Sequence, residues 1–177
     1  MNAPPVELVI MGVSGSGKTT LGEALALRLG WPFKEGDELH PPGNIARMSA
    51  GEALTDADRA PWLAAVAQWI DGWRRAGVSG VITCSALKRA YRQSLSQGRL
   101  EVRFVYLHGA PELLAERVAR RKGHFMPPAL LASQLADLEP PAPDEPVITI
   151  DIDQPIAAQV AAVLQALSKA PTHPART

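Results

Sequence analysis

The segment from Gly12 to Thr20 has the residue types and the spacing needed to hold a nucleoside triphosphate, because it contains G-x-x-x-x-G-K-[ST] in full. Its glycines let consecutive backbone N–H groups turn toward phosphate oxygens. Lys18 can reach the β- and γ-phosphates, and the Thr19 hydroxyl can join the shell of a Mg²⁺ ion. The motif predicts a nucleoside triphosphate with Mg²⁺ but does not name a second substrate. The residues of this loop expected to contact the nucleotide are Gly12, Val13, Ser14, Gly15, Ser16, Gly17, Lys18, Thr19 and Thr20.

Two carboxylates, Glu35 and Asp37, flank a glycine within a short predicted strand at 33–37. Because residues two apart on a strand point to the same face, we expect the two side chains to lie together. Glu35 can hold Mg²⁺ through water, and Asp37 can accept a proton from an attacking hydroxyl. His40 follows and can hydrogen-bond a polyol or a carboxylate. The alternative interpretation is a solvated acidic turn with an ordinary loop histidine.

Three further cations are candidates for holding an anionic acceptor. Arg47 and Arg59 precede or begin a helical stretch, and arginine can grip a carboxylate through two parallel hydrogen bonds. Both arginines can equally be surface partners of nearby carboxylates such as Asp56 and Asp58. Lys88 follows a predicted strand, where a cation is well placed to meet an acceptor.

A basic cluster within 117–128 is a candidate for a mobile lid. Its cations and histidine are Arg117, Arg120, Arg121, Lys122 and His124. We expect Arg117 and Arg121 to contact the nucleotide and His124 to contact the acceptor. Arg121 is also a catalytic candidate, because a closing arginine stabilises the charge that develops in phosphoryl transfer. A solvated basic helix end is the alternative.

Alternating strands and helices must position these groups. Short apolar runs predict strands at 6–11, 78–84, 102–107 and 147–150, in addition to 33–37. Helical patterns cover 18–29, 61–74, 111–118, 129–138 and 156–167. This alternation predicts an α/β fold with a parallel sheet flanked by helices, whose ligands bind beyond the carboxyl ends of the strands. The tryptophans of the second helix are spaced as a core face rather than as a stacking platform.

The chain of 177 residues is the size of one domain, and we expect a core at about 6–168 with tails at 1–5 and 169–177. Eighteen basic and 18 acidic residues cancel, which argues against nucleic acid or an anionic membrane as partner. No apolar run approaches the ~20 residues of a membrane-spanning helix. Cys84 is the single cysteine, so no intrachain disulfide can form, and a cytoplasmic location is expected.

Together, these segments resemble the bacterial gluconokinases, a P-loop kinase group related in architecture to shikimate and adenylate kinases. The resemblance covers nearly the whole chain between the tails. The phosphate loop alone is shared by a vast superfamily, whereas three other segments are much narrower. These segments are Gly36-Asp37-Glu38-Leu39-His40-Pro41, Cys84-Ser85-Ala86-Leu87-Lys88 and Arg121-Lys122-Gly123-His124-Phe125.

The resemblance implies that ATP and Mg²⁺ phosphorylate D-gluconate to 6-phosphogluconate. It implies that Asp37 lies near the attacking hydroxyl, with His40, Arg59 and Lys88 as contacts of the acceptor. It also implies that Arg121 belongs to a lid over ATP and that the protein is a homodimer. One departure is Glu35, where the family usually has aspartate, so the carboxylate stands about one methylene further out. A kinase for another small acceptor, such as shikimate or a nucleoside monophosphate, and an ATP-sensing module are the rival interpretations.

Overall fold

The computed structural model describes residues 5–121, 127 and 129–169, which form a five-stranded parallel sheet in the order β2-β3-β1-β4-β5. The strands are β1 (Glu7–Met11), β2 (Phe33–Lys34), β3 (Gly80–Thr83), β4 (Val102–His108) and β5 (Val147–Asp151). β1 lies at the centre, paired with β3 on one side and with β4 on the other. This arrangement confirms the predicted α/β class.

Helices cover both faces of the sheet. They are α1 (Lys18–Leu29), α2 (Pro42–Ser49), α3 (Asp56–Ala76), α4 (Arg89–Ser96), α5 (Pro111–Arg120), α6 (Ala129–Asp137) and α7 (Ile156–Lys169). Alternate residues of β1 serve the two faces, because successive strand side chains point in opposite directions. Leu8 and Ile10 pack in the core formed with α1, α5 and α7, whereas Val9 and Met11 pack in the core formed with α3 and α4.

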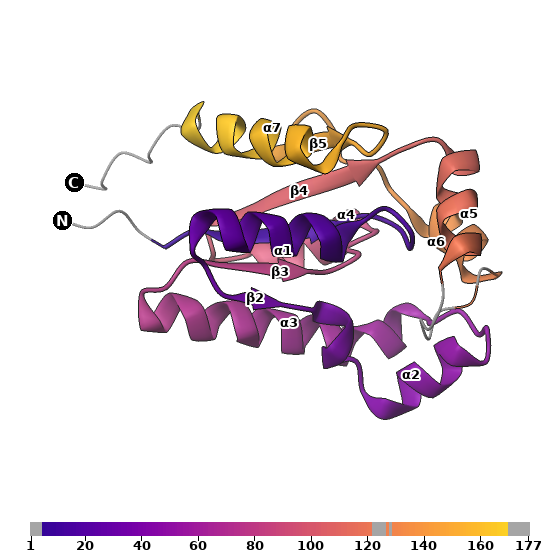
Figure 1. Cartoon of the computed structure of the whole chain (residues 1–177). Helices are drawn as coiled ribbons and strands as arrows, with labels where there is room; N and C mark the ends of the chain where they lie inside the picture. The colour runs from indigo at the N-terminus through magenta and orange to yellow at the C-terminus, as the bar shows by residue number, and fades with distance from the viewer. Residues whose placement is uncertain (1–4, 122–126, 128, 170–177) are drawn as a thin grey trace.

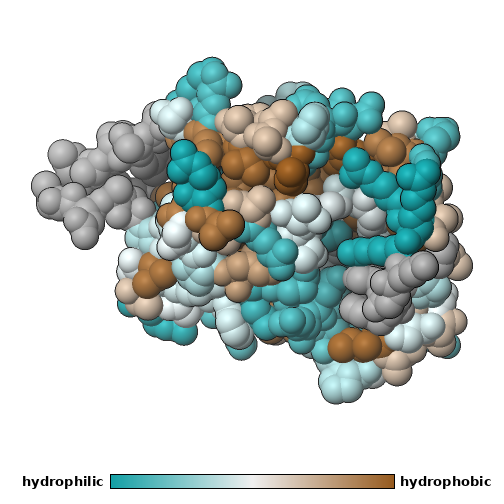
Figure 2. Space-filling view, viewed as in Figure 1, coloured by the Kyte–Doolittle hydropathy of each residue, from teal (hydrophilic) through white to brown (hydrophobic). Residues whose placement is uncertain are grey.

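All five strands point the same way, so their carboxyl ends meet at one edge of the molecule. Figure 1 shows α2, α5 and α6 gathered at this edge and both chain ends at the opposite side. In the same view, hydrophilic side chains gather over α5, and hydrophobic ones show between α1 and α7 (Figure 2). Within the described residues, none of the helices combines the length and the hydropathy needed to cross a bilayer. The loops that follow the strands lie at the edge formed by the carboxyl ends of the strands.

The strand predicted at 33–37 is shorter in the structure, so the expected strand geometry of Glu35 and Asp37 is wrong. β2 ends at Lys34, and Gly36–Leu39 form a 3₁₀ turn, η1, that Glu35 caps. Local chemistry favours the turn, because the Glu35 carboxylate accepts the backbone N–H of Asp37 at 3.5 Å. The two carboxylates nevertheless stay close, because Glu35 raises the pKa of Asp37 and both act on the pKa of Lys18.

The helix predicted at 61–74 begins five residues earlier, at Asp56. Thr55 and Asp58 form a capping box that starts the helix, and Pro61 lies inside its second turn. Trp62 is buried, as the pattern predicted, but Trp69 is 41% exposed. The helix α4 was not predicted, because its few apolar residues are separated by arginines and serines.

Candidate active site

The phosphate loop joins β1 to α1 with the backbone conformations that its glycines permit. Gly15 and Gly17 have φ of 80° and 93°, and Gly17 caps the N-terminus of α1. A β-carbon at Gly15 would lie 2.6 Å from Val118 of α5, so no larger residue fits. Lys18 donates to the carbonyl of Val13 at 3.1 Å. Burial lowers the pKa of this lysine, against the opposing attraction of Asp37.

A chain of hydroxyls and one carboxylate connects the phosphate loop to β3. The Thr19 hydroxyl donates to Oε2 of Glu35 at 2.5 Å, and the Thr83 hydroxyl donates to Oε1 of the same carboxylate. The backbone N–H of Gly36 donates in turn to Thr83 at 2.9 Å. The longer glutamate thus reaches the threonine of the loop directly. A hydroxyl and a carboxylate oxygen are the ligand types that Mg²⁺ prefers, so these residues fit the predicted metal.

Gly36 lies so close to the sheet that a side chain there is sterically impossible. A β-carbon would stand 1.8 Å from the carbonyl oxygen of Thr83. The indole N–H of Trp62 donates to the Gly36 carbonyl at 2.8 Å and fixes the other side of this peptide. Glycine at this position therefore presses the turn against β3 and sets where Asp37 stands.

Two adjoining cavities open at this edge of the sheet. The first is lined by the phosphate loop, Lys18 and Arg121. The second is lined by η1 and segments of α2, α3 and α6. The residues that line both cavities are Asp37, Ser85 and Gln134. A ligand in one cavity would therefore meet a ligand in the other beside Asp37.

Asp37 has the surroundings of a proton acceptor. Burial raises the pKa of its carboxyl and Glu35 adds to the rise, whereas Lys18 and Arg121 oppose it. A raised carboxyl pKa moves the group toward working pH, where it can take a proton from a hydroxyl more effectively. Of the groups predicted for catalysis, Lys18, Asp37 and Arg121 all line the first cavity.

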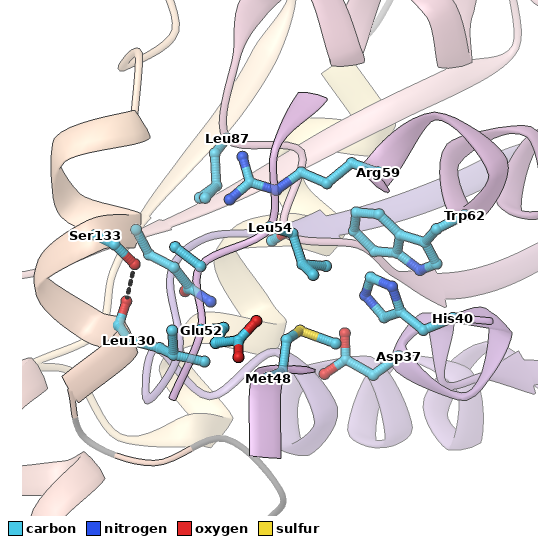
Figure 3. Close-up of a pocket in the computed structure, with 13 residues that line it drawn as sticks. Asp37, His40, Met48, Glu52, Leu54, Arg59, Trp62, Leu87, Leu130 and Ser133 are labelled. Atoms are coloured by element: carbon cyan, nitrogen blue, oxygen red, sulfur yellow. Dashed lines mark hydrogen bonds between the residues drawn. The ribbon is translucent and has the colours of Figure 1, made fainter. Parts of the chain in front are cut away.

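One cation lines the second cavity in the described part of the chain, and it is Arg59. Its guanidinium pairs with the carboxylate of Asp137 at 2.8 Å and donates to the Tyr91 hydroxyl at 3.2 Å. Figure 3 shows Arg59 extending over the cavity, with the carboxylates of Asp37 and Glu52 below it. The cavity therefore presents a fixed positive group opposite two negative ones.

His40 and Trp62 form one wall of the second cavity. Their rings stack with centroids 4.2 Å apart and an interplanar angle of 11°. Burial, together with the nearby charge of Arg59, lowers the pKa of His40 to about 4. Its Nδ1 atom is buried and has no hydrogen-bond partner in the described structure. A neutral imidazole with one unsatisfied nitrogen can bind a hydroxyl group of a ligand.

Arg47 and Lys88 do not line either cavity. Arg47 pairs with Asp58 at 2.8 Å and with Glu52 at 3.2 Å. Lys88 pairs with Asp56 at 2.8 Å. Arg47 thus takes up the ion-pair arrangement that the sequence left open as its alternative, and Lys88 is ion-paired as well. Arg47 nevertheless holds Glu52, which does line the acceptor side.

The predicted lid lies only partly within the described residues. Arg117 is on α5 and donates to the carbonyl of Ile152 at 2.8 Å, with another of its nitrogens beside Gly17. Arg121 follows the end of α5 and lines the first cavity. His124, with the rest of 122–126 and residue 128, is outside the described part of the chain.

Several cavity residues were missed when the sequence was read alone. Trp62 was assigned to the core, and Gln134 fell within a predicted helix without any role assigned to it. Ser85 stood in a flagged loop but was not chosen. Glu52 was not chosen either, although it lies in the lining of the second cavity. Gln134 had no usable signal, since helical spacing identifies a face but not its neighbour.

Comparison with known proteins relates this site to a kinase family. The family model described as shikimate kinase matches residues 14–140. The gluconokinase of Gluconobacter oxydans is 55% identical over 85% of this chain and 84% of its own length. A gluconokinase structure from Sinorhizobium meliloti superposes with a TM-score of 0.83 at 46% identity, covering 95% of this chain and 94% of that one. An unliganded sugar kinase from Janibacter gives a TM-score of 0.89 at 49% identity, covering 95% and 97%.

Proposed function

The chain belongs to the gluconokinase family, and on that premise we propose that it transfers the γ-phosphoryl group of ATP to the 6-hydroxyl of D-gluconate. The products are ADP and 6-phospho-D-gluconate. The observation that carries this proposal is the junction of the two cavities at Asp37, beside a phosphate loop and opposite a fixed cation. Phosphoryl transfer depends on positioning and charge stabilisation, and this junction supplies both.

The acceptor binds with its carboxylate toward Arg59 and its 6-hydroxyl toward Asp37. The neutral His40 and the carboxylate of Glu52 line the space between and bind the intervening hydroxyls. A linear polyol with one anionic end matches this distribution of charge. Glucose lacks the carboxylate, so Arg59 would have no anionic partner and binding would weaken.

In the transfer step, the 6-hydroxyl oxygen forms a bond to the γ-phosphorus while the bond from that phosphorus to the β,γ-bridging oxygen breaks. Asp37 orients the hydroxyl and accepts its proton. Lys18 and Arg121 stabilise the charge on the transferring group and on the departing ADP. Thr19 and Glu35 would hold Mg²⁺, which neutralises β- and γ-phosphate oxygens when bound. Arg117, Lys88, Arg47 and His124 remain predicted contacts, the first of the nucleotide and the others of the acceptor.

The protein functions as a cytoplasmic homodimer in this proposal. The cytoplasm supplies Mg-ATP, and the single cysteine, Cys84, is buried with a pKa that burial raises to about 12. Dimerisation rests on the resemblance to the gluconokinases. Light scattering on the purified chain measures the assembly directly, and a monomer mass would contradict the dimer.

The proposed reaction is tested by measuring ADP release from Mg-ATP with D-gluconate, shikimate, AMP, glucose or no acceptor. We expect turnover with gluconate and background rates with the others. Turnover with another acceptor would keep the phosphate-loop chemistry and overturn the substrate. Binding of ATP without turnover on any acceptor would favour the sensing module.

The variant Lys18→Ala serves as the inactive control for this assay. It removes the cation that faces the phosphates, so transfer to gluconate should fall at least ~10³-fold. Retained turnover in this variant would show that the phosphate loop is not the site of transfer.

A further inference from the structure

Helix α6 contacts both halves of the site through one stripe of side chains. Leu130, Ser133, Gln134 and Asp137 follow the spacing i, i+3, i+4 and i+7, which places them on one face of a helix. The first three line the second cavity, which we call the acceptor cavity because the proposed acceptor binds there. Figure 3 shows Leu130 and Ser133 at the side of that cavity away from Trp62. We call these four residues the α6 stripe.

Gln134 connects this helix to the phosphate loop. Its side-chain oxygen accepts a hydrogen bond from the backbone N–H of Ser14 at 2.6 Å, across 120 residues of sequence. Gln134 and Ser14 are both buried, at 9% and 6% exposure. A buried N–H that loses its acceptor is strongly unfavourable, so this contact has a large influence on where the loop lies.

Asp137, three residues further along the stripe, connects the same helix to the acceptor side. Its carboxylate lies 2.8 Å from the Arg59 guanidinium. Just beyond the helix, the backbone N–H of Glu139 donates to the carbonyl of Leu87, which also lines the acceptor cavity, at 2.9 Å. Helix α6 therefore contacts the phosphate loop through Gln134 and Arg59 through Asp137, and the residue pair Glu139–Leu87 joins the segment after the helix to the same cavity.

We propose that α6 acts as a strut that sets the distance between the phosphate loop and the acceptor, with Gln134 and Asp137 as its positioning residues. The inference rests on the proposed function. Gln134 acts through Ser14, and Asp137 acts through Arg59. Because a misplacement of about 1 Å between reacting groups can cost ~10²-fold in rate, the Gln134 end of the strut contributes to the transfer step itself, whereas the Asp137 end contributes to holding the acceptor through Arg59.

The first test is Gln134→Met, which keeps the length of the side chain but removes the oxygen acceptor. We expect kcat with gluconate to fall ~10- to 100-fold, while KM for ATP and for gluconate stays within about threefold. This pattern marks an interaction that matters in the transition state. A purely structural loss would lower the melting temperature and raise both KM values.

The matched control is Gln159→Met on α7. Gln159 is also buried, at 6% exposure, and its side-chain amide donates to the carbonyl of Gln154 at 2.8 Å, away from both cavities. This variant should keep the wild-type kcat. An equal fall in kcat in both variants would overturn the proposal, because any buried glutamine would then have the same effect.

Asp137→Ala tests the other end of the strut. Release of the Arg59 guanidinium should raise KM for gluconate ~10-fold with kcat within about threefold, and Asp137→Asn should restore part of the affinity, because it keeps an oxygen acceptor. A lower KM would show that Asp137 only weakens the charge of Arg59, and it would overturn this half of the proposal.

If Gln134→Met does not fold, Gln134→Asn replaces it, since it keeps the amide and shortens its reach by one methylene. A wild-type kcat in whichever Gln134 variant folds overturns the strut. The wild-type reaction in the same assay separates the two levels of the argument. A wild-type protein inactive on gluconate refutes the proposed function, whereas an active wild type matched by Gln134→Met refutes the strut alone.

Discussion

The two ends of the sheet both carry charged side chains, but they use them in opposite ways. At the carboxyl ends, Lys18, Asp37 and Arg59 line open cavities. At the amino ends, the charged residues mostly bind one another, and the cluster consists of Glu7, Asp71, Arg74, Arg99 and Glu101. Arg99 holds Asp71 through two bonds of 2.7 Å, and Arg74 reaches Glu101 at 3.2 Å.

Charged residues thus serve two purposes in this fold: those at the amino ends of the strands stabilise the chain, and those at the carboxyl ends are placed to bind a ligand. Paired groups at the amino ends stabilise the chain modestly, because each ion pair is partly exposed. The groups at the carboxyl ends leave binding capacity for a ligand, and burial shifts the pKa of Lys18 and Asp37 against their charged forms. Substitutions at the two ends should therefore affect different measurements.

Asp37→Asn should produce the largest effect and should act on activity alone. We expect kcat to fall about 10²- to 10⁴-fold, as loss of a general base does, with ATP affinity nearly unchanged. Stability should stay the same or rise, because burial disfavours the charged carboxylate of the wild type. Steady-state kinetics and thermal unfolding measure the two quantities on the same sample.

An unchanged kcat in Asp37→Asn would remove the proton-accepting role. A large loss of stability in this variant would contradict the division between the two ends of the sheet, because a residue at the carboxyl ends would then be stabilising the fold.

Glu7→Gln should produce an intermediate effect and should act on stability alone. Glu7 is fully buried, neither carboxylate oxygen has a hydrogen-bond partner in the described structure, and burial raises its pKa to about 7. Between pH 4.5 and 7 the unfolded chain loses this proton before the folded one, so the wild type loses stability as pH rises. Glutamine removes that penalty. We therefore expect the difference in unfolding free energy between variant and wild type to be about 3 kcal/mol more favourable to the variant at pH 8 than at pH 4.

Chemical denaturation of both proteins at pH 4, 6 and 8 measures this gain, with kcat as the second readout. A stability difference that does not change with pH would contradict the raised pKa. A change in kcat would show that the amino end influences the site.

Arg99→Gln should produce the smallest effect. It removes a guanidinium that donates two hydrogen bonds to Asp71, in a pair whose side chains are 16% and 28% exposed. We expect a loss of about 1 kcal/mol that shrinks in high salt, with kcat unchanged. Denaturation in low and high salt tests this, and a loss independent of salt would point to packing instead of charge.

The sequence alone predicted the architecture and the nucleotide end of the site. A strand, a glycine-rich loop and a helix are contiguous, so the motif from Gly12 to Thr20 describes its own geometry. The parallel sheet followed from apolar runs that alternate with helical patterns. These features are formed by residues that are contiguous in the chain, so they can be predicted from the sequence.

The acceptor cavity was harder to predict because it is assembled from distant segments. From the sequence, Arg59 and Lys88 were equally good candidates for binding an anionic acceptor. Only the fold shows that Lys88 pairs with Asp56, whereas Arg59 lines the acceptor cavity. The turn at Glu35 was read as a strand, because a capping hydrogen bond spanning two residues leaves no periodic signal. Gln134 depends on a partner 120 residues away.

The central position of β1 has a consequence for how the chain folds while the ribosome is still synthesising it. β1 pairs with neither β2 nor any other strand that follows it closely. Its partners begin at Gly80 and Val102, and the N–H of Gly12 donates to the carbonyl of Ser85. The first strand to be synthesised stays unpaired until nearly half of the chain has been made, because its first partner, β3, ends at Thr83. A fold that depends on such non-local strand pairing forms slowly. Until the pairing forms, the unpaired strand edge is free to aggregate with other nascent chains. The nucleotide loop, which is the easiest part of this protein to find in its sequence, is thus among the parts that cannot take shape early in synthesis.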